Sequence, residues 1–161
     1  MDEPLTQFPR RPRRLKIIWS TRSRPIFFIT ACINNRWPLL KTSDVHNEFI
    51  RYCLDSSKRT GVWVGRYVIM PNHLHVFVSC DGSLSLSRWM KGLKGSLSKC
   101  LRALGQVGPF WQDGFFDHLL RSGESYSKKW QYVFLNPVRA GFVERAEDWS
   151  YSGEIEVLSW E

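Results

Sequence analysis

The chain has 161 residues, of which 43% are hydrophobic, and it carries a formal net charge of +8. This length suits a single domain, and the excess of Lys and Arg favours a polyanionic partner, either nucleic acid or an anionic membrane surface. No apolar run approaches the roughly 18–20 residues of a membrane span, and the N-terminus lacks the apolar segment of a signal peptide. We therefore expect a cytoplasmic protein that binds nucleic acid and not a membrane.

Residues 1–20 are predicted to form a basic N-terminal arm. Pro9 and Pro12 argue against a helix there. The arm is either a solvated tail or a segment that contacts phosphates. Its candidate contacts are Arg10, Arg11, Arg13 and Arg14.

The first half of the chain contains three candidate strands and one candidate helix. Residues 26–33 are a continuous β-branched and aromatic run, which predicts a central strand buried on both faces. A helix is expected over residues 42–59, with Ser43 or Asp44 as its cap. Residues 62–70 and 74–80 are predicted to pair as an antiparallel hairpin, because Pro71 and Asn72 leave only a tight connection between them.

Two histidines stand at the start of the return strand of this hairpin. Successive strand side chains alternate between faces, so His73 and His75 point the same way and Leu74 points the opposite way. Two neighbouring imidazoles on one face form half of a metal site.

A long helix is expected next, capped by Ser83 or Ser85 and ending near Leu104, with an apolar seam that packs on a sheet. Its other side is cationic. That side is either an ordinary solvated face or a surface that lies along a nucleic-acid backbone. The residues that would contact DNA there are Arg88, Lys91, Lys94 and Arg102.

An aromatic segment at residues 110–118 follows, and it includes Trp111. It either pins the sheet edge by burying its rings or offers a stacking surface for unpaired bases. His118 within it is predicted to be a core or hydrogen-bonding histidine.

The last predicted helix runs from Ser122 or Ser125 to about Leu135. Tyr132 and Asn136 are four residues apart and share a helix stripe. Pro137 disfavours helical geometry at Asn136 and puts it at or just beyond the helix end. The Asn136 oxygen would suit Mg²⁺ or Mn²⁺ beside the histidines. Residues 137–161 are expected to form a packed but irregular extension, and residues 1–161 one domain.

A tyrosine near such a metal could attack a phosphodiester and form a covalent phosphotyrosine. Tyr132 is the preferred nucleophile. Tyr126 is the alternative, although it falls on the apolar stripe of the same helix.

Three blocks of the sequence carry a family resemblance. They are MPNHLHVFV at 70–78, WQDGFFDHLLR at 111–121 and YVFLNPVRAGFV at 132–143. The first block is similar to the HUH motif (His, hydrophobic residue, His). In this order the blocks resemble the REP-associated tyrosine transposases, a branch of the IS200-like single-tyrosine HUH transposases.

The resemblance implies a ferredoxin-like α+β fold, an antiparallel sheet with helices packed on one face. It implies metal-dependent cleavage and rejoining of single-stranded DNA next to REP-like hairpins through a 5′-phosphotyrosine. By motif position, His73 and His75 are metal ligands, Tyr132 is the nucleophile, and Asn136 stands where related transposases carry a further polar ligand, often Gln. The protein would act as a monomer or a homodimer. The alternatives are a replication-initiator type of HUH nuclease and a non-catalytic protein that binds DNA hairpins.

Overall fold

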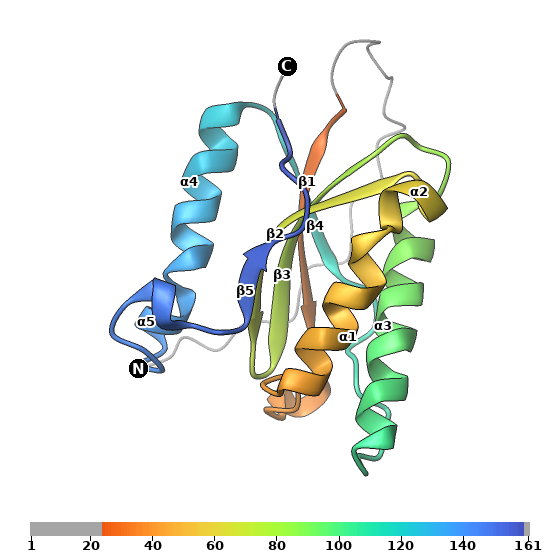
Figure 1. Cartoon of the computed structure of the whole chain (residues 1–161), viewed down its shortest axis with the longest axis vertical. Coiled ribbons are helices and arrows are strands. Elements are labelled where there is room, and N and C mark those ends of the chain that lie inside the picture. Colours follow the sequence, from red (N-terminus) through yellow and green to blue (C-terminus); the bar gives the residue numbers. More distant parts are fainter. Residues whose placement is uncertain (1–23, 160–161) are drawn as a thin grey trace.

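One antiparallel sheet organises the computed structural model, which describes residues 24–159 (Figure 1). Its strand order is β4-β1-β3-β2-β5, so the strand that carries the two histidines, β3, is in the centre. The strands are β1 (Ile26–Cys32), β2 (Val62–Met70), β3 (His73–Cys80), β4 (Phe116–Leu120) and β5 (Ser152–Glu154). The predicted hairpin is confirmed, because β2 and β3 pair antiparallel around a two-residue turn at Pro71 and Asn72.

Helices cover both faces of the sheet (Figure 1). One face carries α1 (Ser43–Leu54), α2 (Ser56–Thr60) and α3 (Leu86–Ala103), and the other carries α4 (Gly123–Phe134) and α5 (Asn136–Arg139). The predicted α+β class with a ferredoxin-like antiparallel sheet is confirmed. The detail that helices pack on one face needs correction, because α4 buries Tyr126 and Val133 against the second face.

Each face has its own hydrophobic core. Strand alternation sends Leu74 and Val76 of β3 toward α1 and α3, whereas Phe77 points to the α4 side. Short 3-10 segments, η1 (Asn34–Arg36) and η2 (Ala146–Asp148), complete the loops.

The caps follow the sequence closely. Ser85 and Ser122 accept hydrogen bonds from backbone N–H groups three residues later, at the starts of α3 and α4. Thr42 caps α1 instead of the predicted Ser43 or Asp44. The predicted helix over residues 42–59 is divided near Asp55 into α1 and α2.

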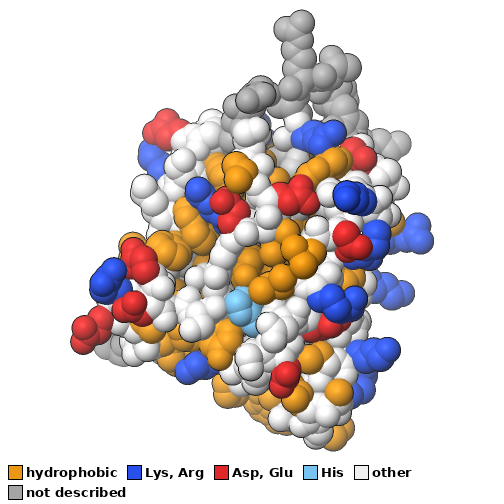
Figure 2. Space-filling model, viewed as in Figure 1, with side chains coloured by type: hydrophobic (Ala, Val, Ile, Leu, Met, Phe, Trp, Pro, Cys, Tyr) orange, Lys and Arg blue, Asp and Glu red, His pale blue; other side chains and the backbone are white. Residues whose placement is uncertain are grey.

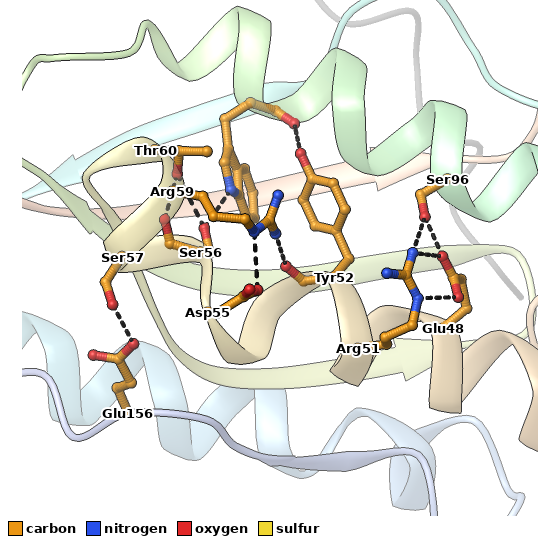
Figure 3. Close-up of polar contacts among 11 residues, drawn as sticks. Glu48, Arg51, Tyr52, Asp55, Ser56, Ser57, Arg59, Thr60, Ser96 and Glu156 are labelled. Atoms are coloured by element: carbon orange, nitrogen blue, oxygen red, sulfur yellow. Dashed lines mark hydrogen bonds and ion pairs between the residues drawn. The ribbon is translucent and has the colours of Figure 1, made fainter.

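Polar contacts join α1, α2 and α3 (Figure 3). The Trp89 indole N–H donates to Ser56 Oγ at 2.8 Å, and Tyr52 Oη donates to the Trp89 carbonyl at 3.1 Å. Ser96 of α3 donates to the Glu48 carboxylate of α1. These bonds hold the three helices of this layer to one another.

The segment after Pro137, predicted to be irregular, contains two ordered elements. The η2 turn buries Ala146, and β5 pairs with β2 at Arg66, Tyr67 and Val68. An edge strand of this kind needs only backbone hydrogen bonds. The sequence of β5, Ser-Gly-Glu, therefore contains no residue type that predicts a strand. None of the helices between residues 24 and 159 is long and apolar enough to cross a membrane.

Candidate metal and nucleophile site

The two histidines lie side by side at the start of β3. Their ring centroids are 4.8 Å apart and the ring planes meet at 78°. The ring of His75 stacks on Phe28 of the neighbouring strand at 5.2 Å. Both rings therefore stand on the face of the sheet that α4 and α5 cover.

Each imidazole has its Nδ1 atom engaged by a neighbour. His73 Nδ1 lies 2.7 Å from Asn72 Oδ1, and His75 Nδ1 lies 2.8 Å from Thr30 Oγ1. We assign the ring proton to Nδ1 in both cases, because an amide oxygen and a hydroxyl oxygen can both accept. This tautomer leaves each Nε2 atom with its lone pair.

The Asn136 amide meets both free Nε2 atoms. Its Nδ2 atom is 3.3 Å from His73 Nε2 and 3.2 Å from His75 Nε2, so the amide donates to both. Rotation of the amide by 180° would exchange nitrogen and oxygen and present Oδ1 at the same place. Pro137 explains the position, because α4 ends at Phe134 and Asn136 begins α5.

This donor set fits a divalent cation. Two imidazole nitrogens converge on the Asn136 amide, whose oxygen takes the place of Nδ2 when the amide rotates, and each imidazole has the second hydrogen bond that orients a metal-binding histidine. Water and a phosphate oxygen would complete the coordination of Mg²⁺ or Mn²⁺. Residues 24–159 contain no cluster of three or more His, Cys, Asp or Glu side chains that could hold a metal, so the candidate site depends on the asparagine.

Burial and positive charge keep both imidazoles neutral. Desolvation is the main cause that lowers the pKa of His73 to about 4, and the charge of Arg36 adds to it. Desolvation also lowers the pKa of His75 to about 3, with contributions from His73, Lys129 and Arg139. A neutral imidazole is the form that binds a metal, so both side chains are ready as ligands at neutral pH.

Tyr132 lies in the last turn of α4. This helix ends at Phe134, and Asn136 begins α5. Its side chain is 64% exposed, and the Arg139 guanidinium carbon lies 3.9 Å from its ring centroid. The charge of Arg139 also helps to lower the pKa of His75. Asn136 thus contacts both histidines, and α4, the helix that bears Tyr132, covers the same face of the sheet.

Tyr126, the alternative nucleophile, is buried in the core. Its ring packs edge-on against Phe77 at 5.0 Å, and its hydroxyl is buried without a hydrogen-bond partner among the described residues. Desolvation raises the pKa of this phenol. A substrate phosphate cannot reach it without unpacking α4.

The cationic side of α3 lies away from this site. Figure 2 shows Lys and Arg side chains gathered along the edge of the molecule that α3 forms. Arg88, Lys91 and Arg102 are exposed, but α3 covers the sheet face opposite to the histidines. Lys94 instead donates to the backbone carbonyls of Gln112, at 3.0 Å, and Gly114.

The other predicted contacts have different outcomes. Arg10, Arg11, Arg13 and Arg14 lie outside the described residues. The Trp111 indole N–H donates to Ser98 Oγ at 3.1 Å and the ring is partly buried, so this side chain secures the segment to α3. His118 is exposed on β4, which contradicts the core alternative of its prediction, and the hydrogen-bonding alternative stays a prediction.

Sequence reasoning missed the residues that surround the histidine pair. Thr30 faces His75 only because β1 and β3 pair in that register. Arg36, Lys129 and Arg139 supply the positive charge near the imidazoles. Their spacing in the sequence gives no signal of this convergence, although each is a basic residue close to a quoted motif or strand end.

Comparisons with known proteins agree with this fold and indicate the family. The family model described as "Transposase IS200 like" matches residues 19–133. A REP-associated tyrosine transposase of Escherichia coli (strain K12) is 26% identical over 129 residues, which cover 78% of this chain and 74% of that protein. A protein of Haemophilus influenzae named "Putative REP-associated tyrosine transposase" is 40% identical over 138 residues, covering 79% of this chain and 78% of that protein.

A solved structure of a REP-associated tyrosine transposase bound to a REP hairpin has the same fold. It superposes with a TM-score of 0.68 at 22% identity, over 89% of this chain and 81% of that chain. This likeness supports the antiparallel α+β fold. The chain belongs to the IS200-like transposase family, and the predicted resemblance to its REP-associated branch is confirmed.

Proposed function

We propose that this protein cleaves and rejoins single-stranded DNA next to hairpins, in a metal-dependent reaction that passes through a 5′-phosphotyrosine. The observation that carries this proposal is the convergence of His73 Nε2, His75 Nε2 and the Asn136 amide within 3.3 Å. Family membership supports DNA strand transfer as the overall activity. A relative bound to a REP hairpin makes hairpin DNA the expected partner.

Each side chain has one role in the proposed reaction. His73, His75 and Asn136 would hold Mg²⁺ or Mn²⁺, which when bound acts as a Lewis acid toward the scissile phosphate. Tyr132 Oη attacks the phosphorus, its proton passes to water at this exposed position, and the bond from phosphorus to the 3′ oxygen breaks. The leaving 3′ oxygen takes a proton from water, so that this strand ends in a 3′-hydroxyl, and the 5′ phosphate stays on Tyr132. A later 3′-hydroxyl reverses these steps and releases the tyrosine.

Arg139 is suited to neutralise the phosphate between these groups. Its guanidinium lies over the Tyr132 ring and within electrostatic range of His75. A guanidinium can form two parallel hydrogen bonds with phosphate oxygens.

A single chain supplies every proposed group. The α4 helix that bears Tyr132 packs on the sheet of its own chain through Tyr126 and Phe77, and Asn136 of the same segment contacts the histidines. We infer that a monomer is sufficient for cleavage.

A covalent adduct on a denaturing gel tests the nucleophile. The protein is incubated with a labelled hairpin oligonucleotide that has a single-stranded flank, in Mg²⁺ or Mn²⁺. We expect an adduct with the wild type and with Tyr126→Phe, and none with Tyr132→Phe. The two variants lose the same hydroxyl from one helix, so an adduct in Tyr132→Phe, or its loss in Tyr126→Phe, would overturn the assignment.

Metal binding gives an independent test of the ligand set. Titration of Mn²⁺ in the absence of DNA, followed by electron paramagnetic resonance, should show binding by the wild type that weakens at least tenfold in Asn136→Ala. Gln131→Ala is a suitable control, because Gln131 is exposed on the neighbouring helix. Equal binding by Asn136→Ala and wild type would remove the asparagine from the ligand set.

A further inference from the structure

A cavity of about 280 Å³ opens between residues 33–39 and the loop at 107–110. Ile33 and Phe110 line it and are almost fully buried, whereas Trp37 and Val107 are 55% and 81% exposed. Its volume is just below the usual range for pockets that bind drug-sized ligands. It is therefore of a size for one small planar group.

The backbone around the cavity is held firmly. The Asn34 N–H donates to the Phe110 carbonyl at 2.8 Å, and Asn34 Nδ2 donates to the Pro109 carbonyl at 3.3 Å. Asn35 and Arg36 adopt φ values of 53° and 54°, a conformation that is unfavourable for residues other than glycine. Backbone strain of this kind persists where surrounding contacts enforce it and is enriched at binding sites.

The cavity adjoins the histidine pair. Ile33 N–H donates to the Asn72 carbonyl at 2.9 Å, Leu40 N–H donates to the Pro71 carbonyl at 2.9 Å, and Cys32 faces His73 in the register of β1 and β3. The β2–β3 turn and the segment that follows β1 thus lie at the same end of the sheet (Figure 1).

Two cations flank the cavity. Arg36 is exposed next to Asn35, which lines the cavity, and its charge helps to lower the pKa of His73. On the other side, the Arg102 guanidinium carbon lies 5.5 Å from the Phe110 ring centroid. This places the C-terminal end of α3, unlike the rest of its cationic side, near the same end of the molecule.

We propose that this cavity binds one unpaired nucleobase of the DNA strand whose phosphodiester lies at the histidine pair. The inference rests on the proposed function and adds a recognition element to it. The exposed Trp37 ring offers a stacking face, and base–aromatic stacking is a common contribution to single-strand binding. The amides of Asn34 and Asn35 carry the donor and acceptor pattern that base edges require. Arg36 and Arg102 take up the phosphates on either side of the base.

A strand with a single missing base provides the test. In a Tyr132→Phe background, which prevents cleavage, fluorescence anisotropy measures the affinity for single-stranded flanks in which one abasic site is moved along the tract. We expect one position to lose at least fivefold in affinity. Adding Trp37→Ala should lower the affinity for the intact strand by a similar factor. The same substitution should not lower the affinity for the strand that is abasic at that position any further. Trp37→Phe should retain most of the affinity for the intact strand.

Two equally exposed valines allow a negative charge to be introduced inside and outside the cavity. Val107 lines the cavity and Val157 does not, yet they are 81% and 80% exposed. Val107→Glu should weaken binding at least fivefold, and Val157→Glu should change it less than twofold. Equal effects of the two substitutions would overturn the proposal.

The outcomes separate this inference from the proposed function. Adduct formation by the Tyr132-containing protein, together with Trp37→Ala binding that matches wild type, would overturn the base site alone. Absence of any binding to single-stranded DNA would overturn both. If Trp37→Ala instead shifted the oligomeric state in sedimentation analysis without changing DNA affinity, the surface would belong to a second copy of the chain.

Discussion

Acidification from pH 8 to pH 5 should lower the free energy of unfolding by about 4 kcal/mol through the histidine pair alone. In the folded protein the pKa values of His73 and His75 are about 4 and about 3, both below the ordinary value of 6.5. Both rings are therefore neutral when folded and take up a proton on unfolding between pH 6.5 and about 4. Each proton changes the unfolding free energy by about 1.4 kcal/mol per pH unit, or about 2 kcal/mol per histidine at pH 5.

The sign follows from the lowered pKa values. The stability is present above pH 6.5 and is lost as the pH falls toward the folded pKa values, and no further loss from these groups occurs below about pH 3. His46 also has a lowered pKa because of burial, and it adds to the loss in the wild type. A comparison with His75→Asn removes this common term.

Urea denaturation followed by far-UV circular dichroism at pH 8, 7, 6 and 5 measures the effect. Between pH 6 and pH 5, the unfolding free energy of His75→Asn should fall by about 1.2 kcal/mol less than that of the wild type. Coincident transitions by fluorescence would verify two-state unfolding. Equal pH slopes in the two proteins would refute the argument that the His75 ring is neutral and desolvated in the folded state.

Three further predictions concern the supports of the site and of the fold. Thr30→Val removes the oxygen 2.8 Å from His75 Nδ1 and should weaken Mn²⁺ binding about tenfold or more with an unchanged circular dichroism spectrum; unaltered affinity would show that the threonine does not orient the ring. Gly61→Ala places a methyl group at φ 68° against the Asp81 side chain and should cost at least about 1 kcal/mol of stability in urea denaturation; a neutral result would contradict the observed turn geometry. If α3 contacts phosphates, Lys91→Ala should reduce the salt dependence of single-strand binding by about 0.7 in the log–log slope, and an unchanged slope rejects α3 as a phosphate contact. Lys94→Ala should mainly lower the melting temperature, because this lysine is bonded to two backbone carbonyls.

The central strands could be predicted from the sequence because their patterns are strong and local. The run at residues 62–70 matches β2 residue for residue, and the tight turn at Pro71 and Asn72 identified the hairpin. Pro137 likewise predicted where α4 ends. A short strand at the sheet edge was one of the alternatives for residues 110–118, and β4 (Phe116–Leu120) overlaps the end of that segment. The edge strand β5 was not anticipated, since it is stabilised by backbone pairing with a strand far away in the sequence.

The pairing of site residues was predictable only in part. Alternation along β3 put His73 and His75 on one face, and a spacing of four residues linked Tyr132 to Asn136. The partner of His75 required knowledge of the register between β1 and β3, and the basic residues around the site required the tertiary fold. The sequence correctly predicted that one side of α3 is cationic. Only the tertiary structure shows that α3 packs on the sheet face opposite to the histidines.

Alternation in β3 couples the candidate site to the stability of the core. Leu74 and Val76 are almost fully buried against α1 and α3, while His73 and His75 face α5. A shift of one residue in the pairing of β3 would turn the imidazoles into the apolar core and expose the aliphatic side chains. Burying two leucine-sized side chains stabilises the fold by about 3–6 kcal/mol, so the core itself holds the histidines in place. Tyr132 is under no such constraint, because it is exposed at the end of α4. The candidate metal ligands are thus positioned by the buried part of the fold, whereas the proposed nucleophile lies on an exposed part of α4.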